Sequence, residues 1–217
     1  MPLTFPLQPS QFMNLLPIRS MTFEPPETVE VSRTRGGEIL RAERGARLWQ
    51  GRIELDEMSP AEANRVLPLI NVLRANGTFL VTDPLHARPQ SDPAGAVSAA
   101  APVLASAEGR EMTISGLPAG YILRRGDLVS WTYGANPLRY ALHEVASDTV
   151  VASGAGVTDE IEVSPPIRPW GSLAGRPVRL ITPWCKALIV PKSVNSGRRR
   201  NGGRVADVAF DFIQTLR

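Results

Sequence analysis

The clearest pattern of apolar and polar positions lies in the first half of the chain. Residues 49–56 alternate between apolar or small and polar side chains, which predicts a strand that buries one face. Ser59 and Glu62 have the spacing of a capping box, so a helix should begin there and end before Gly77. Residues 78–81 predict a second strand. The apolar stripe of the helix consists of Ala63, Val66, Leu67, Ile70 and Leu73.

Two neighbouring features of this region also carry predictions. Pro68 lies inside the expected helix, where it lacks a backbone N–H and crowds the carbonyl of Asn64, so we expect a kink or two shorter helical pieces. Residues 28–34 alternate and are followed by a turn at Gly36 and Gly37. This pattern predicts a hairpin-like pair with the strand that starts near Leu48.

The second half of the chain predicts short strands joined by turns. We expect strands at 112–114, 128–133, 138–145, 157–163 and 178–181, which is typical of a small antiparallel barrel or sandwich. We expect its core to hold the alternate residues Val129, Trp131, Tyr133, Leu138, Tyr140 and Leu142.

The end of the chain returns to a regular alternation over residues 205–215, which predicts a paired final strand. The N-terminal block has too few strands to close a sandwich alone, and the C-terminal strands could complete it. We therefore expect a first domain formed by residues 1–82 and 183–217, with residues 83–182 inserted as a small β-barrel domain.

Composition supports a mostly β protein. The 217 residues include 20 prolines and 18 glycines, spread along the chain, and few long helical patterns. The net charge of +3 is small for this length, which argues against a general polyanion-binding field. A single cysteine, Cys185, excludes an internal disulfide, and no apolar stretch is long enough to span a bilayer, so no membrane insertion is expected.

Candidate chemistry is sparse. His86 and His143 are the only histidines and have no metal-ligand spacing, so we expect no metal, no cofactor and no catalytic residues. His143 is interpreted as a half-exposed strand residue. Asp83 and His86 could form an acid–base pair, but no serine stands in a nucleophile elbow.

Two loops are the candidate interaction sites. Residues 195–204 form a basic, glycine-rich segment that predicts a loop ordered against a polyanion or a partner's acidic surface, or a merely mobile and solvated one. The segment from residue 85 to 101 has no periodicity and follows a Thr-Asp-Pro turn, which favours a crossing between domains. The candidate residues are Arg198, Arg199, Arg200 and Arg204 in the first loop, and Asp83, Pro84, Leu85 and His86 in the second.

With these motifs placed, the chain resembles the distal tail proteins of long-tailed, siphovirus-type bacteriophages and related gene transfer agents. The likeness rests on short motifs spread over most of the chain. They are residues 49–55, the helix from Ser59 to Leu73, residues 77–84 with nearby Pro89, residues 123–129, 142–145 and 165–168, and the Phe210-Asp211-Phe212 ending. The segment before Pro26 departs from the family, because it is proline-rich and less strand-like than expected.

The resemblance implies a β-sandwich belt domain with one helix and an inserted small antiparallel β-barrel of galectin-like or OB-like type. It also implies a structural virion protein at the tail tip, assembled in the host cytoplasm, in which six copies close into a ring. The implied partners are the tail tube protein, the baseplate hub or tail fibre protein and the tape measure protein, with DNA only passing through the channel. In such a ring, the resemblance implies that the loop from Arg198 to Arg204 faces a neighbouring subunit or the channel, and that the loop at residues 85–101 packs across the subunit boundary.

Two other functions stay open on the sequence. A carbohydrate-binding module could use Trp131, Tyr133 and Trp170 as stacking platforms, which requires these rings to be exposed. A tail-associated hydrolase would need Asp83 and His86 in a cleft with a further catalytic group.

Overall fold

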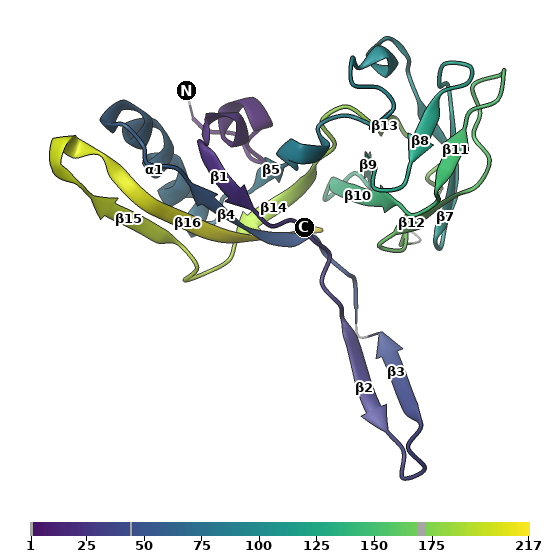
Figure 1. The fold of residues 1–217 in the computed structure, drawn as a ribbon, viewed down its shortest axis with the longest axis horizontal. Helices are drawn as coiled ribbons and strands as arrows, with labels where there is room; N and C mark the ends of the chain where they lie inside the picture. Colours follow the sequence, from purple (N-terminus) through teal and green to yellow (C-terminus); the bar gives the residue numbers. More distant parts are fainter. Residues whose placement is uncertain (1, 44, 169–171) are drawn as a thin grey trace.

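The computed structural model describes residues 2–43, 45–168 and 172–217. The chain folds into two β units that lie side by side, and a two-stranded arm projects away from both (Figure 1). The prediction of a mostly β protein with a sandwich-like unit and a small barrel is confirmed.

The elements divide among three parts. The first unit contains β1 (Ile18–Met21), β4 (Gln50–Leu55), α1 (Pro60–Ala75), β5 (Phe79–Val81), β14 (Cys185–Ile189), β15 (Asn195–Arg199) and β16 (Val205–Gln214). The arm contains β2 (Val29–Arg33) and β3 (Ile39–Glu43). The second unit contains β6 (Val103–Glu108), β7 (Glu111–Ser115), β8 (Ile122–Arg124), β9 (Leu128–Tyr133), β10 (Arg139–Val145), β11 (Thr149–Val151), β12 (Ile161–Ser164) and β13 (Val178–Arg179). Short 3₁₀ turns lie at Pro9–Gln11, Met13–Leu15, Pro84–His86, Ala96–Ala99 and Asn201–Gly203.

The first sheet combines strands from both ends of the sequence in the order β1-β4-β16-β14-β5, and β15 pairs with the first half of β16. The long strand β16 therefore contacts three other strands, all antiparallel. One face of this sheet buries the large rings Phe12, Phe79, Phe210 and Phe212, which meet at edge-to-face or tilted angles. The regular alternation at the end of the chain is explained by this core.

Helix α1 covers the first unit beside β14 and begins as the sequence predicts. The Ser59 hydroxyl accepts from the Glu62 N–H, and the Glu62 carboxylate accepts from the Ser59 N–H at 2.8 Å. Of the two outcomes expected at Pro68, a kink or two shorter helical pieces, the second is wrong, because α1 runs as one helix from Pro60 to Ala75. Pro68 and Asn64 lie on the exposed face, so water can satisfy the carbonyl that lacks its helical donor.

The second unit is a small barrel. Its main sheet has the order β13-β9-β10-β12-β7-β6, and a bridge between Val103 and Pro177 joins the last strand back to the first. The N–H groups of Leu104 and Val178 donate across the same seam to Arg176 and Pro102. This closure leaves the main sheet of the barrel without a long free edge.

The predicted barrel core is right for β9 and wrong for β10. Val129, Trp131 and Tyr133 are buried inside the barrel as expected. In β10, however, Ala141 and Val145 point into the barrel, whereas Leu142 belongs to the core of the first unit. Lys186 of the first unit lies over the Tyr140 ring, and Leu138, which precedes β10, is 42% exposed. None of Leu138, Tyr140 and Leu142 therefore belongs to the barrel core.

The arm corrects the prediction for residues 28–48. Val29–Arg33 pairs with Ile39–Glu43 around a turn in which Gly37 has a φ of 84°, and not with the strand that follows Leu48. All side chains from residue 31 to residue 42 are exposed. In Figure 1 the arm extends well beyond the body of the molecule.

No helix in the described ranges is long and apolar enough to cross a lipid bilayer.

Gly51 should be essential to the first sheet. A Cβ at Gly51 would lie 1.8 Å from the Thr22 carbonyl oxygen, whereas a Cβ at the exposed Gly154 would meet nothing within 4 Å. Because Thr22 is held by backbone and hydroxyl hydrogen bonds to Arg52, the two strands would have to separate. We expect Gly51→Ala to lower the free energy of unfolding by about 3 kcal/mol or more, near the upper end for overpacked sites.

Urea denaturation of Gly51→Ala, with Gly154→Ala as the matched control, checks this expectation. Equal unfolding free energies for the two variants would contradict the packing described for β4.

Candidate functional site

The two β units meet through side chains of the first unit that donate to backbone carbonyls of β10 and of Leu138, which precedes this strand. The Trp49 indole N–H donates to the Leu142 carbonyl at 2.7 Å, and the Gln214 amide donates to the Tyr140 carbonyl at 2.9 Å. Lys186 donates to the Leu138 carbonyl at 3.1 Å, and burial lowers the pKa of its ammonium group. These bonds join β4, β14 and β16 of the first unit to β10 of the barrel.

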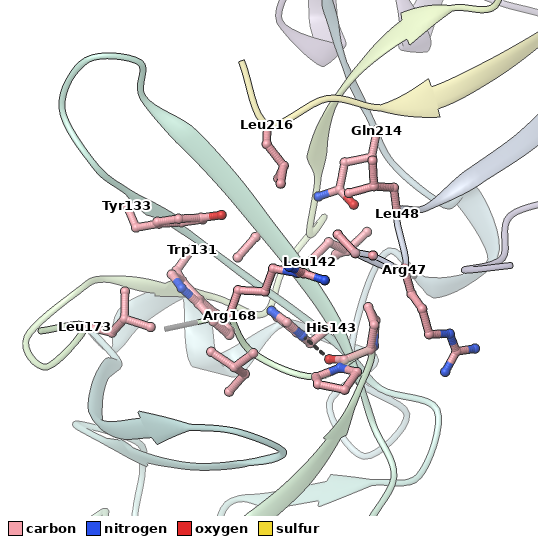
Figure 2. Close-up of a pocket in the computed structure, with 16 residues that line it drawn as sticks. Arg47, Leu48, Trp131, Tyr133, Leu142, His143, Arg168, Leu173, Gln214 and Leu216 are labelled. Carbon is pink, nitrogen blue, oxygen red and sulfur yellow. Dashed lines mark hydrogen bonds between the residues drawn. The ribbon is translucent and has the colours of Figure 1, made fainter. Parts of the chain in front are cut away.

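A pocket of about 230 Å³ lies at this junction (Figure 2). Its walls come from the root of the arm, the barrel strands β9 and β10, the segment after β12, and the end of the chain. The labelled lining residues in Figure 2 are Arg47, Leu48, Trp131, Tyr133, Leu142, His143, Arg168, Leu173, Gln214 and Leu216.

His143 lies in the wall of this pocket, and the expectation that it is half-exposed is wrong. Its side chain is buried and stacks on the Trp131 ring at a centroid distance of 4.7 Å. Nδ1 lies 2.7 Å from the Pro165 carbonyl oxygen, which can only accept, so Nδ1 carries the proton and Nε2 is an acceptor. Burial lowers the pKa of His143 to about 4, although the bond to Pro165 opposes this shift.

Two other polar side chains in the pocket wall, those of Arg47 and Gln214, have structural partners. Arg47 donates to the carbonyls of Pro25 and Pro26, which fixes the root of the arm. Gln214 bonds to Trp49 and Tyr140 on its two sides. The Trp131 indole N–H is the one buried side-chain group in the described ranges without a hydrogen-bond partner. The pocket thus belongs mainly to the seam between the units.

The burial of the barrel aromatics bears on the carbohydrate-binding alternative. Trp131 is 3% exposed and Tyr133 is 8% exposed, so neither can act as a flat stacking platform for a sugar. Trp170, the third predicted platform, lies outside the described residues. The carbohydrate-binding alternative therefore has no support from Trp131 and Tyr133.

The basic segment at residues 195–204 is mostly a hairpin, which corrects the prediction of a loop. Residues 195–199 form β15, paired with β16, and only the tip around Gly202 is a turn. Arg198 forms an ion pair with Asp207 at 2.9 Å, and Arg200 and Arg204 approach Glu57 at 3.8 and 4.0 Å. A glycine-rich basic composition is typical of a mobile loop, but strand pairing with β16 orders this segment.

The remaining arginine of this group has a different position. Arg199 lines a groove between α1 and β15, together with Leu67, Pro68 and Val194. All four predicted arginines thus lie at one end of the first sheet, and their ion pairs are exposed and contribute about 0–1 kcal/mol each.

Asp83 and His86 meet, as the acid–base hypothesis requires, but in a local turn. The Asp83 carboxylate accepts from His86 Nδ1 at 2.6 Å and from the Leu85 N–H at 2.9 Å. Pro84 occupies the first position of this 3₁₀ turn, and Leu85 is 88% exposed. The pair therefore closes a turn that presents Leu85 to solvent.

The segment after this turn is anchored on its own barrel. The buried Asp92 carboxylate accepts from the N–H groups of Ala96 and Val97 and from the Tyr121 hydroxyl. Burial alone would raise the pKa of Asp92, but these donors together lower it below its usual value. Such anchoring makes the second half of the 85–101 segment part of the barrel.

Sequence reasoning missed the strongest surface feature, which is the arm. Val31, Ile39 and Leu40 are 54%, 53% and 52% exposed, and they lie in a two-stranded sheet remote from either core. Alternation revealed β2, but Ile39 and Leu40 are adjacent, so the period-two signal of β3 is lost. In the described ranges, no group of three or more His, Cys, Asp or Glu side chains could hold a metal ion.

No protein-family model matches the chain, and the comparison with curated proteins also gives no match.

His143 predicts a specific pH dependence of stability. The unfolded chain binds a proton at this imidazole below about pH 6.5, whereas the folded chain does so only below about pH 4. The unfolded state therefore binds more protons between these values, and the fold loses stability as the pH falls from about 6.5 to about 4. At pH 4.5 the loss from this group should be about 2.5 kcal/mol relative to pH 7.5.

Chemical denaturation of the wild type and of His143→Asn at both pH values measures this loss. The asparagine amide can still donate toward Pro165 but does not titrate, so the stability difference between the two pH values should be about 2.5 kcal/mol smaller in the variant. The same pH dependence in both proteins would contradict a buried, neutral His143.

Proposed function

We propose that the protein is a structural component of a phage-type tail tip, in which six copies close into a ring around the path of the DNA. In this proposal the ring joins the tail tube protein to the baseplate hub or tail fibre protein, and the protein is not an enzyme. The location in the virion and these partners come from the resemblance to distal tail proteins.

The observation that carries the proposal is the arm. Side chains 31–42 are exposed in one chain, including three large apolar ones. An isolated two-stranded hairpin is only marginally stable in water, and exposed apolar groups on it favour association. Contact with other subunits would bury these apolar side chains and stabilise the hairpin, so the arm supports a function in assembly.

The split first unit is a second argument. Strands from residues 18–81 and 185–214 form one continuous sheet, which makes the body a firm support from which the arm extends. If each subunit binds the next through two different surfaces, the same contact repeats from subunit to subunit. Such a head-to-tail contact closes into a ring when the rotation between neighbours permits it.

The proposal predicts that replacing the apolar side chains of the arm abolishes assembly and leaves the fold intact. The test is a triple variant, Val31→Ser with Ile39→Ser and Leu40→Ser, compared with the wild type by native mass spectrometry. We expect the wild type at six times the chain mass and the variant as a monomer with an unchanged far-UV spectrum and melting temperature. The fold should persist because these side chains contribute to neither core.

Val151→Ser is the matched control, because Val151 is 52% exposed on the short strand β11 of the barrel. It should assemble like the wild type. A wild-type chain that stays monomeric at concentrations of tens of micromolar, or a triple variant that assembles normally, would count against the proposal.

A further inference from the structure

The strand edges of the body are closed or blunted. The N-terminal segment at Leu7 forms a parallel bridge to β5, and the Val103–Pro177 bridge closes the barrel. Strand β1 has a bulge at Arg19. Strand β15 is interrupted at Gly197, where φ is 77°, and β8 and β11 are only three residues long. Natural proteins use these devices to prevent pairing with other chains.

The arm has none of these features that prevent strand pairing. Its two strands pair over five consecutive positions, from Val29↔Glu43 to Arg33↔Ile39, with no shift of register. Alternate residues of each strand direct their N–H and C=O groups outward, so β2 and β3 each present a regular free edge. Within the described ranges, β15 also has an outer edge without a partner strand over five residues, but the left-handed Gly197 interrupts its regular pattern.

The distribution of apolar side chains on the arm favours contact with a partner along its strand edges over contact through one of its faces. Val31 and Ile39 lie on one face, because their cross-strand partners Arg41 and Arg33 share it. Leu40 lies on the opposite face, opposite Ser32. With exposed apolar side chains on both faces, the arm has no single apolar face that would lie on a flat surface. Strand pairing places side chains of both faces beside those of the next strand.

The charges of the arm are balanced, which suits a second copy of the same element. Residues 29–43 contain as many glutamates as arginines, so two arms have no net repulsion. The residues are Glu30, Glu38 and Glu43, and Arg33, Arg35 and Arg41.

We propose that the arm pairs edge to edge with the arm of a second copy of this chain, with β2 of one copy beside β3 of the next. Because each arm then uses a different edge toward each neighbour, the contact is head-to-tail and can repeat around a closed ring. The product is a cylinder of hairpins in which every strand edge is paired. This inference rests on the proposed ring and identifies the part of the neighbour that the arm contacts.

Engineered cysteines test the pairing directly, because the single native cysteine, Cys185, is buried. Ser32→Cys places a thiol on β2. Glu38→Cys places one just before β3, and Leu40→Cys or Ala42→Cys places one within β3, so that alternate positions cover different registers. Two chains with different affinity tags, one of each kind, are co-expressed and purified through both tags. Mild oxidation then reports which strands are neighbours.

The expected result is a disulfide-linked dimer when Ser32→Cys is combined with at least one β3 variant, and none when any variant is present alone. Val151→Cys combined with Ser32→Cys is the control and should give no dimer. Adjacent strands bring the two Cα atoms to about 4.5–5.5 Å, within disulfide reach, whereas the next strand is about 10 Å away.

The outcomes separate the inference from the proposed function. Rings by native mass spectrometry without any β2-to-β3 cross-link would overturn the arm-to-arm pairing and leave the ring in place. Dimers formed by Ser32→Cys alone would also overturn it, because they require β2 beside β2 in a twofold pair. An absence of rings for the wild type would overturn the proposed function together with this inference.

Discussion

The need to satisfy the hydrogen-bonding groups at strand edges organises the whole molecule. In the first sheet, β16 lies between β4 and β14 and also pairs with β15, so the strand with most backbone groups has the most partners. Leu7 covers β5, and the Val103–Pro177 bridge closes the barrel. In the part of the chain that the structure describes, the arm departs from this rule, because β2 and β3 each leave one regular edge without a partner strand. That departure is the basis for proposing an intermolecular role for the arm.

The junction between the units follows from the same requirement. Backbone carbonyls of β10 accept from Trp49 and Gln214, and the carbonyl of Leu138 just before it accepts from Lys186, so directional bonds attach the barrel to the first sheet. The neutral His143 fits this setting, since a charged imidazole among buried rings would need a counter-charge.

The sequence predicts much of the fold because local signals and packing agree there. The strand at 49–56, the capping box at Ser59 and the final strand are visible as periodicity and spacing. The predictions fail where residues distant in the sequence determine the local structure. Pro68 is tolerated because its face is solvated, His143 is buried by a neighbouring strand, and β3 is fixed by pairing with β2 despite its irregular pattern. The predicted basic loop is ordered by the register of β16, which composition alone does not reveal.

The central claim is that the arm becomes a paired element only when copies of the chain assemble. Hydrogen–deuterium exchange of the arm amides, measured over a range of protein concentrations, tests it most directly. The account predicts that amides of β2 and β3 exchange rapidly in dilute protein and become protected as concentration rises, while the buried strands β9 and β16 stay protected throughout. Rapid exchange of the arm at every concentration, in samples that contain rings, would contradict it.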